Sequence, residues 1–314
     1  MNPEDWIEIN IGQWVENLVG FILDNFEPVL DAISAAIGFV ALGLENTLLA
    51  INPLVLSAIL ILLALWRVGW KFAVFVLLSM VLILGMNLWD PTISTLALVV
   101  GASFVALLVG FPVGVAMAKS DTVEALVRPI LDFMQTMPPF VYLIPAAMFF
   151  GLGKVPGTIA TVVFAMPPVV RLTNLGIRQV SVENVEAGRA FGCTDRQLLY
   201  KVQLPLALPS IMTGVNQTIM LSLSMVVIAS MIGAGGLGNV VLTGIQRLNV
   251  GLGFEGGLGV VIVAILLDRL TQSFGRIRTS EGFFTRLMRA LKGEQQKPTV
   301  TGSEQSETPR RAAS

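Results

Sequence analysis

Long apolar segments alternate with short polar stretches along most of the chain. A helix that crosses the hydrocarbon core of a bilayer needs about 20 predominantly apolar residues, or somewhat fewer when interfacial residues extend its ends. Seven segments meet this condition: residues 48–66, 72–89, 92–118, 138–153, 155–171, 206–232 and 256–273. Prolines and glycines occur in several of them, and membrane helices tolerate these residues when neighbouring helices satisfy the freed backbone groups. The pattern predicts an all-α, polytopic membrane helix bundle of about seven spans, with a transmembrane domain over residues 48–275.

Residues 1–47 differ from the rest because acidic side chains interrupt their apolar positions. In the stretch WIEINIGQWVENLVGFILDNF, acids occupy one helical face, and the opposite face holds Ile7, Ile11, Trp14, Leu18, Phe21 and Ile22. This pattern is typical of a helix that lies on a membrane surface, and we expect it on the outer side. Residues 29–47 are apolar apart from Asp31 and Glu45, so the alternative is an eighth span there, which would turn the N-terminus inward.

The basic residues predict the orientation, because cytoplasmic loops of membrane proteins carry an excess of lysine and arginine. With the N-terminus outside, 18 of the 20 basic residues fall on the inner side, and only Lys154 and Arg247 fall outside. We therefore predict a multi-pass protein of a plasma membrane, with its N-terminus outside and its C-terminus in the cytoplasm.

Residues 276–314 have the composition of a cytoplasmic extension. The stretch GFFTRLMRALK sets apolar residues against basic ones, which is typical of an amphipathic helix that contacts anionic lipid headgroups. The residues beyond it are polar and contain no aromatic side chain, so we expect them to be disordered.

A polar insert stands out in a chain that is 54% hydrophobic and 13% charged. Its most polar part is EAGRAFGCTDRQLLYKVQLP, within the predicted inner loop 172–205. Ser181 can N-cap a first helix, and Gly192 stands where a glycine ends one. The spacing from Thr194 to Gln197 is that of a capping box, which predicts a second helix that stops before Pro205.

The two predicted helices form a hairpin with one apolar ridge, made by Val182, Val185, Phe191, Leu198, Leu199 and Val202. A ridge of this kind on the cytoplasmic side can insert into a groove on a partner protein. The alternative is that the hairpin packs on its own membrane domain and that its charged residues form a solvated face. The pattern alone leaves both interpretations open.

The same stretch resembles the EAA loop of permease subunits of bacterial ABC importers, whose pattern is E-A-A-x3-G-x9-I-x-L-P. The positions of this pattern hold Glu186, Ala187, Gly188, Gly192, Val202, Leu204 and Pro205. Gly188 replaces an alanine and Val202 an isoleucine, and both substitutions keep the size class. The resemblance implies that these seven residues form a coupling site, which docks in a cleft of a cytoplasmic ATPase subunit and transmits ATP-driven closure to the neighbouring spans.

Four further segments are similar to the glycine betaine/proline branch of that family: LDFMQTMPPFVYLIPA, FAMPPVVRLTNLGI, NQTIMLSLSMVVIASMIGAGGLG and VAILLDRLTQ. The resemblance covers about residues 50–275. It implies the ABC importer permease fold and the membrane-spanning subunit of an ATP-driven importer, in a bacterial inner membrane, for glycine betaine, proline or a related osmoprotectant. The implied partners are an ABC ATPase that binds ATP and Mg²⁺, an external solute-binding protein and a second copy of this chain. We expect no enzymatic activity, cofactor, metal or nucleic acid in this chain itself.

Four residues are candidates for the substrate pathway: Phe140, Tyr142, Asn216 and Gln217. Aromatic faces attract quaternary ammonium groups, so Phe140 and Tyr142 can contact a betaine in transit. The alternative is that they pack a proline-broken helix, with Tyr142 at the membrane interface. Asn216 and Gln217 are polar within a span, and they either line the pathway or hydrogen-bond to a neighbouring helix.

Residue counts and motifs exclude other functions. The chain has no histidine and one cysteine, which excludes disulfides, Cys/His zinc sites and Ser-His-Asp triads. GAGGLG (233–238) fits a dinucleotide-binding pattern, but it follows an apolar run of span length rather than a strand, so we predict a turn there. The alternative function is an ion-coupled secondary transporter or channel for small zwitterions. Such proteins keep ionisable residues within their spans, whereas the central portions of the seven predicted spans hold none.

Overall fold

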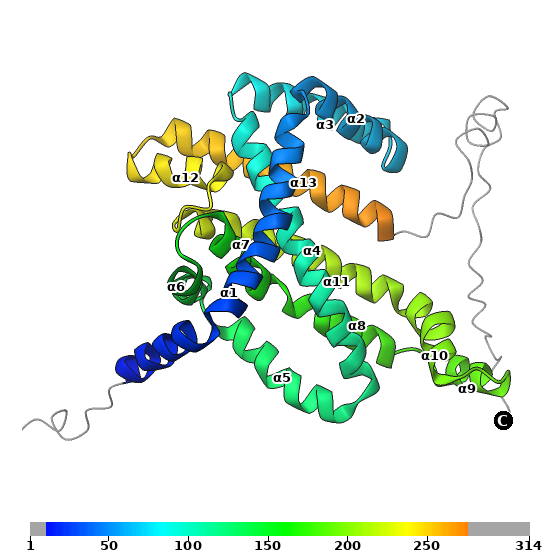
Figure 1. The fold of residues 1–314 in the computed structure, drawn as a ribbon. Coiled ribbons are helices and arrows are strands. Elements are labelled where there is room, and N and C mark those ends of the chain that lie inside the picture. Colours follow the sequence, from blue (N-terminus) through cyan, green and yellow to red (C-terminus); the bar gives the residue numbers. More distant parts are fainter. Residues whose placement is uncertain (1–10, 276–314) are drawn as a thin grey trace, which may run out of the picture. The chain divides into compact units, whose positions relative to one another are not determined.

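The computed structural model describes residues 11–275, and every element in this range is a helix (Figure 1). The helices are α1 (Ile11–Ala50), α2 (Pro53–Arg67), α3 (Trp70–Gly85), α4 (Trp89–Lys119), α5 (Asp121–Thr136), α6 (Pro139–Phe150), α7 (Lys154–Ala165), α8 (Pro167–Arg178), α9 (Val182–Ala190), α10 (Asp195–Leu198), the π-helix η2 (Leu199–Gln203), α11 (Leu204–Ser230), α12 (Gly236–Gln246) and α13 (Val250–Gly275). The predicted C-terminal amphipathic helix and tail lie outside the described residues.

Five helical stretches among the described residues are long and apolar enough to cross a membrane: Gly12–Ala50, Trp89–Lys119, Lys154–Arg178, Asp195–Ser230 and Val250–Phe274. The last four coincide with four of the spans predicted from hydropathy, those at 92–118, 155–171, 206–232 and 256–273. The all-α bundle is therefore confirmed.

The predicted span 138–153 is one half of a broken pair, in which α5 and α6 are bent by 103°. The break falls at Met137 and Pro138, whose ψ angles of 134° and 140° are extended rather than helical. A proline pushes the residue before it out of the α region and cannot donate a backbone hydrogen bond, so two consecutive prolines, Pro138 and Pro139, end α5 here. The bend leaves α5 free to pack against α4, α7 and α8.

The structure corrects the first two predicted spans, 48–66 and 72–89. They are α2 and α3, with 15 and 16 residues, and both are shorter than the roughly 20 residues of a span. Asn52 begins α2, because its side chain accepts a hydrogen bond from the Leu54 backbone N–H at 2.9 Å and Pro53 follows at the first helical position. Gly69, with φ of 133°, reverses the chain into α3. The two helices form a hairpin that packs against α13 (Figure 1).

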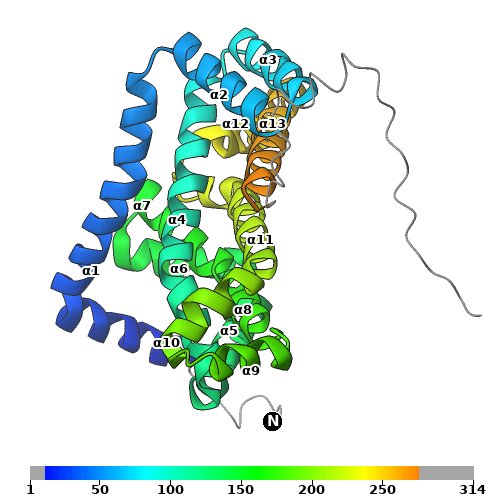
Figure 2. The same ribbon diagram turned by 90° about the vertical axis from the view of Figure 1, so that its right-hand side faces the viewer.

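The structure also moves the N-terminal boundary of the bundle, which hydropathy placed at residue 48. α1 is kinked at Phe26, which has non-helical φ and ψ of −120° and 15° two residues before Pro28. The part after the kink runs alongside α4 (Figure 2) and contacts α4, α6 and α7, so residues 29–47 belong to the bundle. The part before the kink keeps Trp14, Leu18 and Phe21 exposed, as expected of a surface helix. The side of the membrane that it faces stays a prediction.

Glycines allow α4, α8 and α11 to approach closely at the centre of the bundle. A Cβ atom on Gly114 of α4 would lie 2.7 Å from the Val170 carbonyl oxygen of α8, and one on Gly214 of α11 would lie 3.1 Å from the Val169 Cα. Close backbone approach through small residues is the usual way in which membrane helices associate, since lipid supplies no hydrophobic drive. α8 is thereby held rigidly on both sides.

We expect Gly114→Ala to lower the free energy of unfolding by about 1–3 kcal/mol, the usual cost of an overpacked core. The added methyl group meets backbone of α8, which cannot rotate away as a side-chain tip can. Gly257→Ala in α13 is the matched control, because nothing lies within 4 Å of a Cβ there and alanine favours the helix. Thermal unfolding of the detergent-solubilised protein measures both variants. Equal midpoints for the two variants would contradict this packing.

Candidate functional site

The polar insert begins with α9, which ends at Ala190, and Gly192 stands directly after its C-cap as the predicted terminating glycine. Gly192 has φ of 78°, a left-handed conformation that glycine adopts without strain. The Cys193 N–H donates to the Gly188 carbonyl at 3.1 Å, and the Gly192 N–H donates to the Arg189 carbonyl at 2.9 Å. These two bonds form a Schellman motif. At the other end, Ser181 holds the N-cap position, but its hydroxyl accepts from the Asn184 amide instead of capping the backbone.

The capping box of the second helix is confirmed. The Gln197 N–H donates to the Thr194 hydroxyl at 3.3 Å, and the Thr194 N–H donates to the Gln197 side-chain oxygen at 3.0 Å. These reciprocal bonds satisfy two backbone donors at the start of α10. The loop is therefore a helix–turn–helix hairpin whose turn is determined by residues within it.

The prediction that this second helix stops before Pro205 is wrong. α10 continues through η2 into α11, so residues Asp195–Ser230 form one helical stretch of 36 residues. The Leu204 N–H donates to the Leu199 carbonyl, five residues back. A proline ring collides with the carbonyl four residues before it in a regular helix, and this wider turn just before Pro205 accommodates the ring. A displacement of α10 is consequently carried directly into the span α11.

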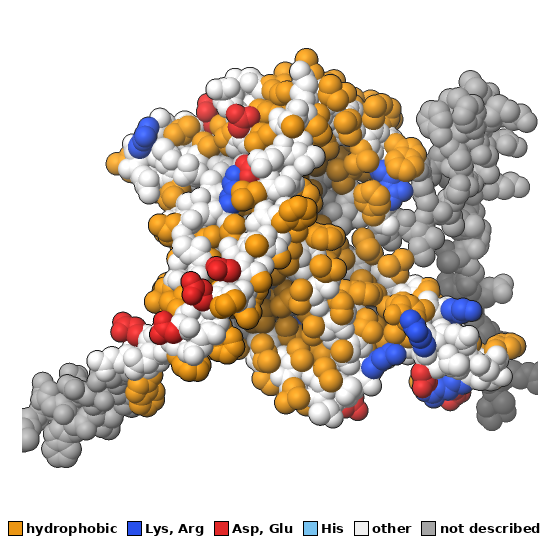
Figure 3. Space-filling model, viewed as in Figure 1, with side chains coloured by type: hydrophobic (Ala, Val, Ile, Leu, Met, Phe, Trp, Pro, Cys, Tyr) orange, Lys and Arg blue, Asp and Glu red, His pale blue; other side chains and the backbone are white. Residues whose placement is uncertain are grey.

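The apolar ridge of the hairpin has two parts, one buried between its two helices and one exposed on its surface. Leu198 and Leu199 are buried, and a Cβ on Gly188 would lie 2.7 Å from Leu198 Cδ1, so α9 packs closely on α10. Val182 and Phe191 face outward, with 66% and 89% of their surface exposed. Figure 3 shows Lys and Arg side chains gathered over α9 and α10. We call Val182, Phe191 and the exposed charged residues of α9 and α10 the coupling surface.

The seven residues predicted for ATPase coupling have different surroundings. Glu186, Ala187 and Gly192 are exposed, Gly188 is buried, and Val202 is half-buried within the hairpin. Glu186 also lines a cleft of about 250 Å³ between α9 and the ends of α4 and α8. Leu204 and Pro205 form the first turn of α11. The structure thus brings most of the predicted set to one hairpin, with Gly188 holding its two helices together.

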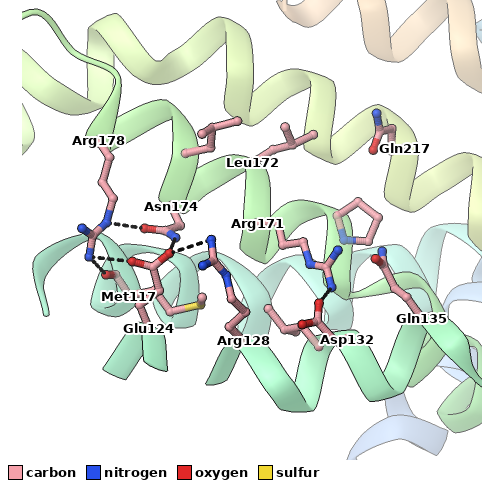
Figure 4. Close-up of a pocket in the computed structure, with 13 residues that line it drawn as sticks. Met117, Glu124, Arg128, Asp132, Gln135, Arg171, Leu172, Asn174, Arg178 and Gln217 are labelled. Atoms are coloured by element: carbon pink, nitrogen blue, oxygen red, sulfur yellow. Dashed lines mark hydrogen bonds and ion pairs between the residues drawn. The ribbon is translucent and has the colours of Figure 1, made fainter. Parts of the chain in front are cut away.

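A larger cavity of about 720 Å³ lies between α5, α8 and α11 (Figure 4). Eight of its thirteen lining residues have charged or amide side chains, and the other five are Met117, Leu131, Pro168, Leu172 and Leu175. The polar residues that line it are Glu124, Arg128, Asp132, Gln135, Arg171, Asn174, Arg178 and Gln217. The cavity has the size range of small-molecule sites, which hold about 300–1,000 Å³.

Arg178, at the end of α8, ties three helices together beside this cavity. Its guanidinium contacts Asp121 at 2.7 Å and Glu124 at 3.0 Å, both of α5, and donates to the Met117 carbonyl of α4 at 2.8 Å. It also donates to the Asn174 side chain one turn earlier at 3.0 Å. Arg178 precedes α9 by only a few residues, so this network joins the coupling hairpin to α4 and α5.

Arg171 and Asp132 form a second and simpler ion pair across the cavity from α8 to α5 (Figure 4). Their side chains remain 38% and 58% exposed. Gln135 of α5 and Gln217 of α11 lie near the pair.

The four predicted pathway residues do not meet in one place. Gln217 is exposed on the cavity wall, whereas Asn216 faces α13 and donates to Asp268 at 3.0 Å. Gln217 is therefore consistent with a pathway role, and Asn216 with helix pairing.

The two aromatic candidates also separate. Tyr142 is buried against Phe164 and donates its hydroxyl hydrogen to the Met134 carbonyl, which spans the break between α5 and α6. Phe140 is exposed on α6 and does not line the large cavity. The geometry favours packing as the role of Tyr142.

The charged residues of the cavity were not predicted as a site, because its arginines served only to predict the orientation of the chain. Their spacing held a usable signal. Glu124, Arg128 and Asp132 are four residues apart and share one face of α5, while Arg171 and Arg178 share one face of α8. This spacing indicates a charged helical face in each segment, but it does not show that the two faces meet.

The glycine-rich stretch 233–238 forms a turn, as predicted. The 27-residue helix α11 precedes it, and Gly233, Gly235 and Gly236 all have positive φ. The Leu237 N–H donates to the Thr95 hydroxyl of α4 at 2.8 Å, and the Gly153 N–H donates to the Ile232 carbonyl at 2.7 Å. The turn therefore fastens the end of α11 to α4 and to the start of α7.

Comparisons with known proteins agree with this architecture. Residues 110–277 match the family described as binding-protein-dependent transport system inner membrane component. Glycine betaine/carnitine transport permease protein GbuB of Listeria monocytogenes is 48% identical over 87% of this chain and 98% of its own length. Glycine betaine/proline betaine transport system permease protein ProW of Escherichia coli is 46% identical over 87% of this chain and 77% of its own length.

A solved structure shows the same fold at lower identity. The MetNI methionine ABC transporter, in an inward-facing conformation, has a chain that matches with a TM-score of 0.52 and 24% identity, over 65% of this chain and 95% of that chain. The comparisons give no support to the alternative of an ion-coupled secondary transporter or channel. The helical bundle, the hairpin between α8 and α11 and these relatives lead to one conclusion: the chain belongs to the family of inner-membrane permease components of binding-protein-dependent transport systems.

Proposed function

We propose that this protein is the membrane-spanning subunit of an ATP-driven importer for glycine betaine, proline or a related osmoprotectant. The observation that carries the proposal is the high identity, over nearly the whole length, to permeases named for glycine betaine transport. The substrate is delivered by an external solute-binding protein, and ATP is hydrolysed by a separate ATPase subunit that binds ATP and Mg²⁺.

The coupling surface supports a mechanism by which closure of the ATPase moves the membrane helices. Phe191, at the turn of the hairpin, and Val182, at the start of α9, offer apolar contacts that a groove on the partner can bury. The exposed Glu186 carboxylate can accept hydrogen bonds from donors on that partner. When the ATPase subunits close, α10 moves, and the continuous helix from α10 to α11 carries the motion into the bundle. Arg178 carries it into α4 and α5. Alternating access follows from these displacements.

The proposal includes a homodimer, because each chain provides one coupling hairpin and the ATPase dimer has two clefts. It also includes an orientation, with the coupling surface in the cytoplasm. Basic side chains gather over α9 and α10 (Figure 3), as the positive-inside rule expects of a cytoplasmic surface.

Uptake into vesicles tests this function. We prepare proteoliposomes that contain the permease, its ATPase and its binding protein. We expect them to accumulate radiolabelled glycine betaine only when ATP is present on the side of the membrane where the ATPase lies. Unlabelled glycine betaine or proline betaine should compete, and a neutral solute such as glucose should not. Accumulation driven by a sodium or proton gradient without ATP would contradict the proposal.

A further inference from the structure

The Arg171–Asp132 pair differs from the other ion pairs around the large cavity, because among the described residues neither side chain has a further polar partner. Arg178 has four protein partners on two neighbouring helices and its own, so its guanidinium is committed to holding α4, α5 and α8 together. Arg128 and Glu124 pair one turn apart on α5, and Glu124 also accepts from Asn174 at 3.2 Å. Among the described residues, the polar partner of Arg171 is Asp132 alone, and both side chains remain open to the cavity.

An exposed ion pair of this kind is easily exchanged for another partner. Such pairs contribute about 0–1 kcal/mol, because water solvates both charges and long side chains lose freedom on pairing. A solute that supplies one negative and one positive group can therefore separate the two side chains at little cost. A solute with a single charge would leave one of them without a partner.

We propose that the cavity between α5, α8 and α11 is a low-affinity site for a zwitterion, in which Arg171 binds its carboxylate and Asp132 lies beside its quaternary ammonium group. This inference rests on the proposed function, since a betaine has these two groups separated by one methylene. Arginine suits a carboxylate because its guanidinium can donate two parallel hydrogen bonds. Gln217 and Gln135 add neutral amide donors near the pair, and neither changes the charge balance.

The chemistry of the wall also explains why the affinity would be low. A quaternary ammonium has no N–H to donate, and the residues that line this cavity include no aromatic ring to attract it. Its attraction to Asp132 is therefore electrostatic and screened by water. Weak binding suits a site that must empty in each transport cycle. The bent pair α5–α6 and the rigid α8 hold the two charged groups, so any motion of α5 relative to α8 alters their separation.

Equilibrium binding to the assembled permease–ATPase complex in lipid nanodiscs, without the binding protein, tests this site. The probes are glycine betaine, choline as a cation alone and acetate as an anion alone, each measured by saturation-transfer NMR. We expect Arg171→Gln and Asp132→Asn each to raise the Kd for glycine betaine by about three- to fivefold, the equivalent of up to about 1 kcal/mol. Arg171→Gln should also weaken acetate but not choline, and Asp132→Asn should weaken choline but not acetate.

Two controls make the result specific. Arg247→Gln removes an exposed arginine directly after α12, outside both the cavity and the coupling surface, and should leave all three Kd values unchanged. Arg171→Lys keeps the charge and should bind glycine betaine within about twofold of the wild type. The site is ruled out if glycine betaine shows no saturable binding, if both neutralised variants bind it as the wild type does, or if one variant weakens all three probes equally. Uptake by the wild-type system, measured in parallel, shows separately whether the proposed function itself fails.

Discussion

Replacing Phe191 by aspartate should reduce solute uptake by about a hundredfold while the permease still folds and inserts. Phe191 is 89% exposed at the turn of the coupling hairpin, so the permease alone loses no packing. Burying an aromatic side chain in a partner groove stabilises a complex by about 2–4 kcal/mol, and a factor of one hundred corresponds to about 2.8 kcal/mol. An aspartate in the same groove would add the cost of burying an unpaired charge.

The measurement is co-purification of the ATPase together with solute-stimulated ATP hydrolysis and uptake. Phe191→Leu is the matched control, since it retains an apolar side chain and should keep most of the uptake. The thermal midpoint of the isolated permease should be the same in all three proteins. Full coupling in Phe191→Asp would show that this surface does not contact the ATPase.

Features that depend on neighbouring residues were predictable from the sequence. The Schellman turn at Gly192 and the capping box from Thr194 to Gln197 each depend on groups within a few positions of one another. Four of the apolar spans were predictable because their length exceeds any alternative for an apolar helix. Even so, hydropathy could not separate a span from the two short helices α2 and α3, because the helix ends at Asn52 and Met86 hardly change a windowed average.

Features that depend on distant residues were not predictable. Arg171 and Asp132 are 39 positions apart, and Lys154 and Glu45 are 109 positions apart, so no periodicity within one helix reveals either pair. The continuation of the second loop helix through Pro205 was missed for another reason. Proline usually ends a helix, but the local π-turn before Pro205 absorbs the steric conflict, and one sequence does not show which outcome prevails.

Replacing Glu45 by alanine should destabilise the permease by about 3 kcal/mol, the typical cost of removing one partner from a buried ion pair. Glu45 of α1 accepts from the Lys154 ammonium at the start of α7, and the two side chains are only 10% and 23% exposed. The alanine variant leaves a mostly buried ammonium without a counter-charge. The same change weakens the attachment of α1 to α7, since this is the one ion pair that joins α1 to the remaining described residues.

A double-mutant cycle separates the charge from the packing. Glu45→Leu combined with Lys154→Met removes both charges while keeping apolar volume, and it should be at least as stable as either single variant, because replacing a buried ion pair by apolar residues is often neutral. Lys119→Met, at an exposed lysine, is the control and should leave the unfolding midpoint unchanged. A double variant less stable than Glu45→Ala would contradict the role of the charges.

Lys154 also follows Gly153, whose N–H donates to the Ile232 carbonyl of the glycine turn. Loss of the pair should therefore also lower the uptake per folded permease, because it loosens the attachment of α11 to α7.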